Sequence, residues 1–121
     1  MEFKAHHRFA DVSSRKLRPF TQLIRGRQAD EALELLRYLH NKSARLLEQC
    51  LKSALGNAEY ERDRQGLTFD MDSLVVTESR VDGGPMMKRI MPRARGTAYP
   101  IKRRYAHIHL TLSDLQPMPE E

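Results

Sequence analysis

The chain has 121 residues, with 21 Lys and Arg against 16 Asp and Glu, so its formal net charge is +5 at neutral pH. This length predicts one domain with a small core, and the basic balance favours an acidic partner. A single cysteine excludes an internal disulfide framework, and the absence of a long apolar run or of a secretory signal pattern predicts a cytoplasmic protein without a membrane span.

The first predicted element is a short strand at 5–12, because apolar and polar residues alternate there. The alternation predicts two faces, one with Ala5, His7 and Phe9 and the other with His6, Arg8 and Ala10.

A helix is predicted next, with Ser13 or Ser14 as the N-cap and Gly26 as the stop. Its apolar stripe consists of Leu17, Phe20, Leu23 and Ile24. Pro19 lies inside this stripe, and we expect it to remove one backbone hydrogen bond and either kink the helix or move its start towards the proline.

Three cations crowd the first turn of this helix, where the helix dipole disfavours positive charge. They are Arg15, Lys16 and Arg18. An anion at the helix N-terminus would explain them, because the free backbone N–H groups and serine hydroxyls there favour phosphate. The alternative is that the three side chains are simply solvated.

Two more helices are predicted, at 29–39 and from Asn41 to about Arg62. The second has an apolar stripe of small and large residues, namely Ala44, Leu47, Cys50, Leu51, Ala54, Leu55 and Ala58. We interpret this stripe as core rather than as a coiled-coil seam, because the heptad-like period is not sustained over three or four heptads, and Cys50 as a small buried hydrophobe. The segment 63–72 is predicted to be a loop that anchors Leu67 and Phe69 on the core.

The segment 81–107 carries no acidic residue after Asp82, and glycines and prolines interrupt any helical period. Strand-like runs flank it, so we predict one very long antiparallel hairpin that turns at 94–96, where Gly96 supplies a positive φ. Gly83 and Gly84 predict a bulge or a close approach of another backbone. Each arm would reach roughly 40 Å.

Such a hairpin has no core of its own, and its cations repel one another. It therefore needs a polyanionic partner that surrounds it. Structured nucleic acid meets both conditions, because phosphates neutralise Lys and Arg while bases and grooves accept Met, Ile and Tyr.

The predicted fold class is α+β, with three helices packed on a small antiparallel three-stranded sheet and a very long extended β-hairpin. We expect a single domain at 1–113, with the hairpin protruding at 82–106, and a disordered C-terminal tail at 114–121.

No catalytic motif is present: the sequence lacks a glycine-rich phosphate loop, a nucleophile elbow and a CxxC pair. The histidines His6, His7, His107 and His109 were candidates for metal ligands. Without cysteine or an acidic companion they are more typical of polar residues on a sheet face, so no metal, cofactor or enzymatic activity is predicted.

Eight segments of this chain resemble the bacterial large-subunit ribosomal protein L twenty-two family. They are RKLR (15–18), LIRG (23–26), EALELL (31–36), KSALGNAE (52–59), VDGGP (81–85), KRIMPRARG (88–96), AYPI (98–101) and KRRYAHI (102–108). The resemblance covers the chain from about Ala5 to Ser113. Four residues differ from the usual family pattern: Asp11, Pro19, Gly83 and Thr97.

The resemblance implies a structural constituent of the large ribosomal subunit that binds rRNA, adjoins neighbouring ribosomal proteins and assists assembly. It implies rRNA contacts by Arg8, Arg15, Lys16, Arg18, Lys88, Arg89, Arg93, Arg95, Lys102, Arg103 and Arg104. It also implies that the hairpin tip lines the nascent-peptide exit tunnel, with Met87, Lys88, Arg89, Arg93, Ala94, Arg95 and Gly96 facing the nascent polypeptide.

Two other functions are compatible with parts of the sequence. A free-standing RNA- or DNA-binding regulator could use the same basic hairpin, and it would sediment apart from ribosomal subunits. A metal-dependent hydrolase built on the histidines would contain metal and lose its activity to chelators.

Overall fold

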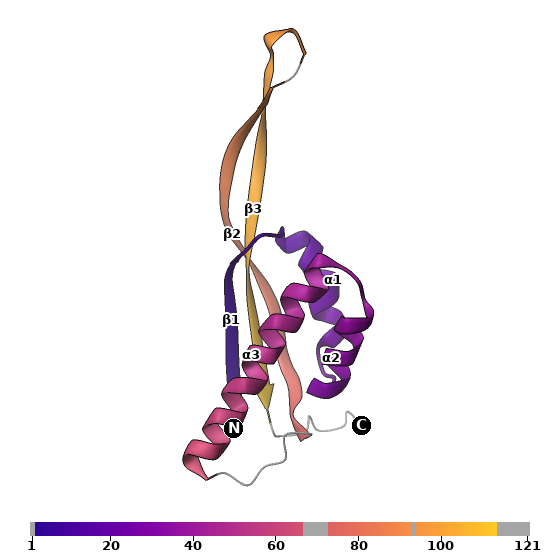
Figure 1. Ribbon diagram of the computed structural model, residues 1–121, viewed down its shortest axis with the longest axis vertical. Helices are drawn as coiled ribbons and strands as arrows, with labels where there is room; N and C mark the ends of the chain where they lie inside the picture. The colour runs from indigo at the N-terminus through magenta and orange to yellow at the C-terminus, as the bar shows by residue number, and fades with distance from the viewer. Residues whose placement is uncertain (1, 67–72, 93, 114–121) are drawn as a thin grey trace, which may run out of the picture.

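The computed structural model describes residues 2–66, 73–92 and 94–113. Its elements in chain order are β1 (Glu2–Ala10), α1 (Ser14–Ile24), α2 (Ala29–Tyr38), α3 (Lys42–Gln65), β2 (Val75–Pro92), the short 3-10 helix η2 (Ala94–Gly96) and β3 (Ala98–Ser113). The helices pack against the lower half of the sheet, and β2 and β3 run on beyond them as a long hairpin (Figure 1). The predicted α+β fold class is confirmed.

The sheet has three antiparallel strands in the order β1-β3-β2, so β3 is the central strand. Leu112 pairs with Phe3 of β1 on one side and with Val76 of β2 on the other. All three side chains are buried. The C-terminal half of β3 therefore forms the centre of the core, while its N-terminal half belongs to the hairpin.

The core lies between this sheet and the helices. From β3 it contains Ala106, Ile108, Leu110 and Leu112, and from α3 it contains Ala44, Leu47, Cys50, Leu51, Ala54 and Ala58. The small alanines allow α3 to approach the sheet closely. Cys50 is a buried hydrophobe as predicted, and burial raises the pKa of its thiol to about 11.

Strand β1 differs from the prediction at both ends. It begins at Glu2 rather than at Ala5, and Phe3 is buried. Its register shifts between His7 and Ala10, so Ala10 is buried while Phe9 is 60% exposed. The predicted faces are therefore wrong beyond His7, because a β-bulge reverses the alternation at that point.

Helix α1 begins at Ser14 with Ser13 as the N-cap, five residues before Pro19, so the proline does not move the helix start. Pro19 is exposed, so the carbonyl group four residues before it, which lacks a backbone N–H partner, lies on the exposed side of the helix. The buried face is formed by Leu17, Thr21 and Ile24, whereas the predicted core residue Leu23 is 38% exposed.

Helices α2 and α3 agree with the predictions. The side chain of Asn41 caps α3 by accepting a hydrogen bond from the backbone N–H of Ser43 at 2.9 Å. Helix α3 continues to Gln65, three residues into the predicted loop, and ends where Gly66 takes a left-handed conformation with φ of 67°. The predicted anchors Leu67 and Phe69, like the tail at 114–121, lie outside the described residues.

The predicted long hairpin is formed by β2, with 18 residues, and β3, with 16, whose core ends belong to the sheet under the helices. It turns at η2, where Arg95 and Gly96 have φ values of 63° and 73°. Among its described residues from Asp82 to Arg104, none is buried. Six large apolar side chains are exposed along it, namely Met86, Met87, Ile90, Met91, Tyr99 and Ile101.

The predicted irregularity at Gly83 and Gly84 is confirmed. The register of β2 against β3 shifts between Gly83 and Met86. A Cβ at Gly84 would lie 2.8 Å from the carbonyl oxygen of Tyr105 in β3. Glycine is therefore required at position 84, where the two backbones approach each other as the hairpin leaves the core.

We expect Gly84→Ala to lower the free energy of unfolding by about 1–3 kcal/mol, because the added methyl group overlaps the Tyr105 backbone. Urea denaturation followed by circular dichroism measures this change. Gly83→Ala is the matched control: a Cβ there has no atom within 4 Å, and its effect should stay within about 0.5 kcal/mol. Equal stability of the two variants would contradict the close approach at Gly84.

Candidate nucleic-acid interface

The hairpin concentrates positive charge without compensation. Lys88 lies directly opposite Lys102, and Arg103 and Arg104 follow on β3. Every ion pair among the described residues lies between positions 11 and 82 or involves His109, so none neutralises these cations. Like charges opposite each other destabilise a strand pair, and a polyanion that contacts both strands removes this repulsion.

The base of the hairpin meets the helical layer at a basic pocket of about 320 Å³. We define the basic pocket by its lining residues, which are Asp11, Val12, Ser13, Lys16, Lys42, Lys102, Arg103 and Arg104. It therefore joins the first turns of α1 and α3 to strand β3. Five cations and two helix N-termini at one place suit an anion such as a phosphate group.

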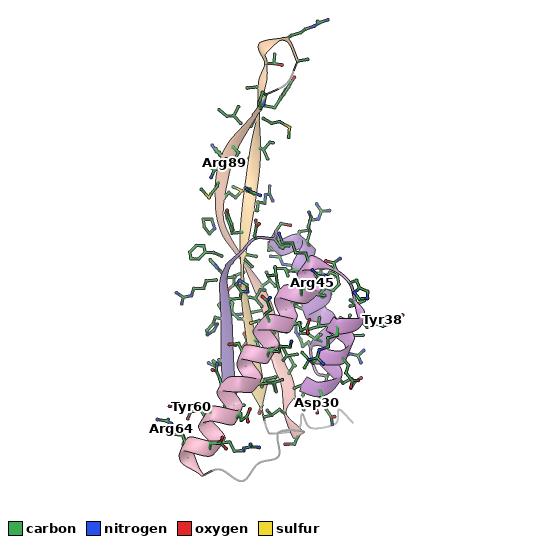
Figure 2. All side chains as sticks on the ribbon, in the orientation of Figure 1. Asp30, Tyr38, Arg45, Tyr60, Arg64 and Arg89 are labelled. Atoms are coloured by element: carbon green, nitrogen blue, oxygen red, sulfur yellow. The ribbon has the colours of Figure 1, made fainter. Side chains whose placement is uncertain are left out.

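The structure brings together only some of the cations proposed from the sequence. Lys16, Lys102, Arg103 and Arg104 share the basic pocket, whereas Arg8, Arg15 and Arg18 are exposed outside its lining. Lys88, Arg89 and Arg95 lie farther along the hairpin, and Figure 2 shows Arg89 well away from the helices. Arg93 is outside the described residues.

Lys42 is a pocket residue that the sequence analysis did not select. Its ammonium group lies 3.4 Å from the carboxylate of Asp11. The same reasoning that singled out the cations of α1 also applies to Lys42, because it is a cation in the first turn of α3. Asp11 therefore offsets one pocket cation through an exposed ion pair that salt screens readily.

The tip is closed by a local hydrogen bond. The hydroxyl group of Thr97 donates to the carbonyl oxygen of Ala94 at 2.8 Å. Arg95 and Gly96 both have left-handed backbones, which turn the chain sharply and leave the Arg95 side chain exposed. The tip thus presents a cation on a tight turn.

His6, His107 and His109 lie on the sheet face away from the helices, whereas His7 alternates with His6 and is half-buried on the face of Ala5. Nδ1 of His109 lies 2.6 Å from Nδ1 of His6, and its Nε2 lies 3.0 Å from a carboxylate oxygen of Asp82. Nδ1 of His107 accepts a hydrogen bond from the backbone N–H of Phe9 at 3.1 Å. Both ring nitrogens of His109 therefore have protein partners, and within 2–66, 73–92 and 94–113 no group of three side chains is arranged to hold a metal ion.

No helix in the described part of the chain is long and apolar enough to cross a membrane.

The chain is similar to known proteins over almost its whole length. The family model described as ribosomal protein L22p/L17e matches residues 5–113. Large ribosomal subunit protein uL22 of Rhodopirellula baltica is 46% identical over 115 residues, which cover 95% of this chain and 97% of that protein. The protein of the same name from Desulforamulus reducens is 47% identical over 114 residues, which cover 94% of this chain and 96% of that protein.

The surroundings of His109 predict a pH dependence of stability. Burial lowers the pKa of its imidazole below the ordinary value, Arg80 and His6 act in the same direction, and Asp82 opposes them. As the pH falls below about 6.5, the unfolded chain therefore binds a proton at His109 more readily than the folded chain. The free energy of unfolding should fall from that pH down to the lowered pKa of the folded state.

Urea denaturation between pH 7.5 and 5 measures this effect. His109→Gln should flatten the decline, while His40→Gln, at an exposed histidine between α2 and α3, should keep the slope of the wild-type protein. A decline of equal steepness in the wild-type protein and in His109→Gln would contradict the role assigned to His109.

Proposed function

Because this chain belongs to the ribosomal protein L22p/L17e family, we propose that it binds rRNA with its hairpin and its basic pocket. The family makes it a structural constituent of the large ribosomal subunit. The observation that carries the proposal is the unneutralised charge of the hairpin. Its described cations from Lys88 to Arg104 have no carboxylate partner among the described residues, and the same strands expose six large apolar side chains. RNA offers phosphates to the cations and base faces to the apolar groups.

The basic pocket gives this binding a fixed starting point. Its lining comes from three elements that are anchored in the core: the first turn of α1, the first turn of α3 and the base of β3. A phosphate group that enters it meets cations whose backbone positions are set by α1, α3 and β3, so less conformational entropy is lost there than along the free arms. The hairpin arms, which lack packing partners of their own, then become ordered as rRNA encloses them.

The tip residues are proposed to lie on the wall of the nascent-peptide exit tunnel, as the family resemblance implies. They comprise Met87, Lys88, Arg89, Arg93, Ala94, Arg95 and Gly96. The length of the hairpin supports this role, because it carries the turn at η2 far from the helical layer (Figure 1). Beside rRNA and the nascent polypeptide, the partners are neighbouring ribosomal proteins.

Sedimentation of cell extracts tests the assignment as a whole. The protein should remain with large subunits in a one-to-one ratio after a high-salt wash, because enclosure of the hairpin by rRNA would retain it although salt weakens each phosphate contact. Recovery of most of the protein in the soluble fraction would favour a free-standing nucleic-acid-binding regulator instead.

We expect Arg104→Ala to weaken binding to a transcript of bacterial large-subunit rRNA and to reduce the slope of log K against log salt by about 0.7–0.9, the value for one phosphate contact. Filter binding at several salt concentrations measures both quantities. Arg64→Ala is the control, since Figure 2 shows Arg64 at the far end of α3 from the hairpin. Equal slopes for the two variants would remove Arg104 from the interface.

Limited proteolysis tests the enclosure of the hairpin. In the free protein trypsin should cut first after Arg95, because the described hairpin residues have no packing partners, and the helical part should survive. In isolated large subunits the same site should resist trypsin. Rapid cleavage after Arg95 in intact subunits would show that the tip is not enclosed.

A further inference from the structure

The bulge in β1 places one aromatic side chain where the alternation of the strand would not put it. Phe3 and Ala5 face the core, so an unbroken strand would also turn Phe9 towards the helices. The register shift between His7 and Ala10 instead gives the buried position to Ala10 and leaves Phe9 60% exposed. Phe9 thus lies on the open face of the sheet, beside the base of the hairpin.

The backbone at Phe9 is in a conformation that bulky residues rarely adopt. Its φ is 59°, in the left-handed region, where glycine or asparagine would be accommodated at lower cost. Strain at a non-glycine residue persists where the surrounding structure enforces it, and it is frequent at binding sites. Here the hydrogen bond from the Phe9 backbone N–H to Nδ1 of His107 holds the residue in place.

The Phe9 ring forms part of an aromatic surface. It contacts the His107 ring edge to face, with ring centroids 5.0 Å apart and planes at 86°. Tyr105 lies two residues before His107 on β3, so both belong to the face opposite the buried Ala106. We call Phe9, Tyr105 and His107 the open-face aromatic cluster.

Cations adjoin this cluster along both strands that carry it. Arg8 precedes Phe9 in β1, and Arg103, which also lines the basic pocket, precedes Tyr105 by two residues in β3; both are exposed. Aromatic rings interleaved with Arg and Lys are typical of surfaces that bind unpaired nucleotides, where the rings stack on bases and the cations contact the flanking phosphates. An apolar protein partner would instead be opposed by the desolvation of these charges.

We propose that Phe9 stacks on an unpaired base of the rRNA where the hairpin leaves the core, and that the edge-to-face contact with His107 fixes the orientation of the Phe9 ring. This inference rests on the proposed function and adds a base contact on the open face of the sheet to the phosphate contacts of the basic pocket. The RNA then holds the hairpin from two sides: phosphates on the helix side and a base on the open side.

Binding of variants to the rRNA transcript tests the proposal. Phe9→Leu keeps the apolar volume but removes the ring, and it should weaken binding by about ten-fold, as expected for the loss of one stacked base. The salt slope should stay that of the wild-type protein, because no charge is removed. Phe9→Tyr, which keeps the ring, should bind within about two-fold of the wild-type protein.

Tyr60→Leu is the matched control, because Tyr60 is 65% exposed and lies near the end of α3 in Figure 2, far from the hairpin. It should bind like the wild-type protein. Ultraviolet irradiation of the wild-type complex at short wavelength, followed by mass spectrometry, should identify a nucleotide adduct on Phe9. This second measurement needs no variant and therefore does not depend on how Phe9→Leu folds.

Failure of the wild-type protein to bind the transcript would overturn the proposed function and this inference together. Normal binding by both Phe9→Leu and the wild-type protein, without an adduct on Phe9, would overturn the stacking contact alone. If Phe9→Leu bound the bare transcript normally but was depleted from assembled subunits, the ring would face a neighbouring protein, which would also overturn the base contact.

Discussion

Electrostatic repulsion within the hairpin is the constraint on which the rest of this structure depends. Two lysines face each other across the strands, further arginines follow, and among the described residues no carboxylate lies close enough to neutralise them. Backbone hydrogen bonds hold the two strands in register, but no apolar interior supports them. The helices and the lower half of the sheet supply the packed base from which this charged hairpin extends (Figure 1).

Strand β3 connects the packed core to the charged hairpin. Its residues Ile108, Leu110 and Leu112 are fully buried between two neighbouring strands and the helices, while Lys102 to Arg104 begin the exposed arm. Between the two parts, Gly84 allows the backbone of β2 to approach Tyr105 of β3 where the register shifts. The transition from core to hairpin therefore takes place within a few residues, and the pocket cations lie directly beside it.

The sequence was sufficient for most of this architecture because the signals are local. Glycines and prolines within a cationic segment excluded a helix, Asn41 marked the start of α3, and paired glycines marked the bulge. Two features were not predictable in this way. The exposure of Phe9 depends on a register shift against β3, which alternation within β1 alone cannot reveal. The position of Lys42 beside Asp11 and β3 depends on how α3 crosses the sheet, which is set by tertiary packing.

Strand β3 also determines how force would travel through the molecule. A load applied to the turn is transmitted along one continuous backbone into the middle of the sheet, where β1 lies antiparallel to it. The hydrogen bonds of that pair would then be loaded together in shear rather than opened one after another. The hairpin is thus anchored in the sheet through its central strand, so a pull on the turn would be resisted by the strand pairs on both sides of β3.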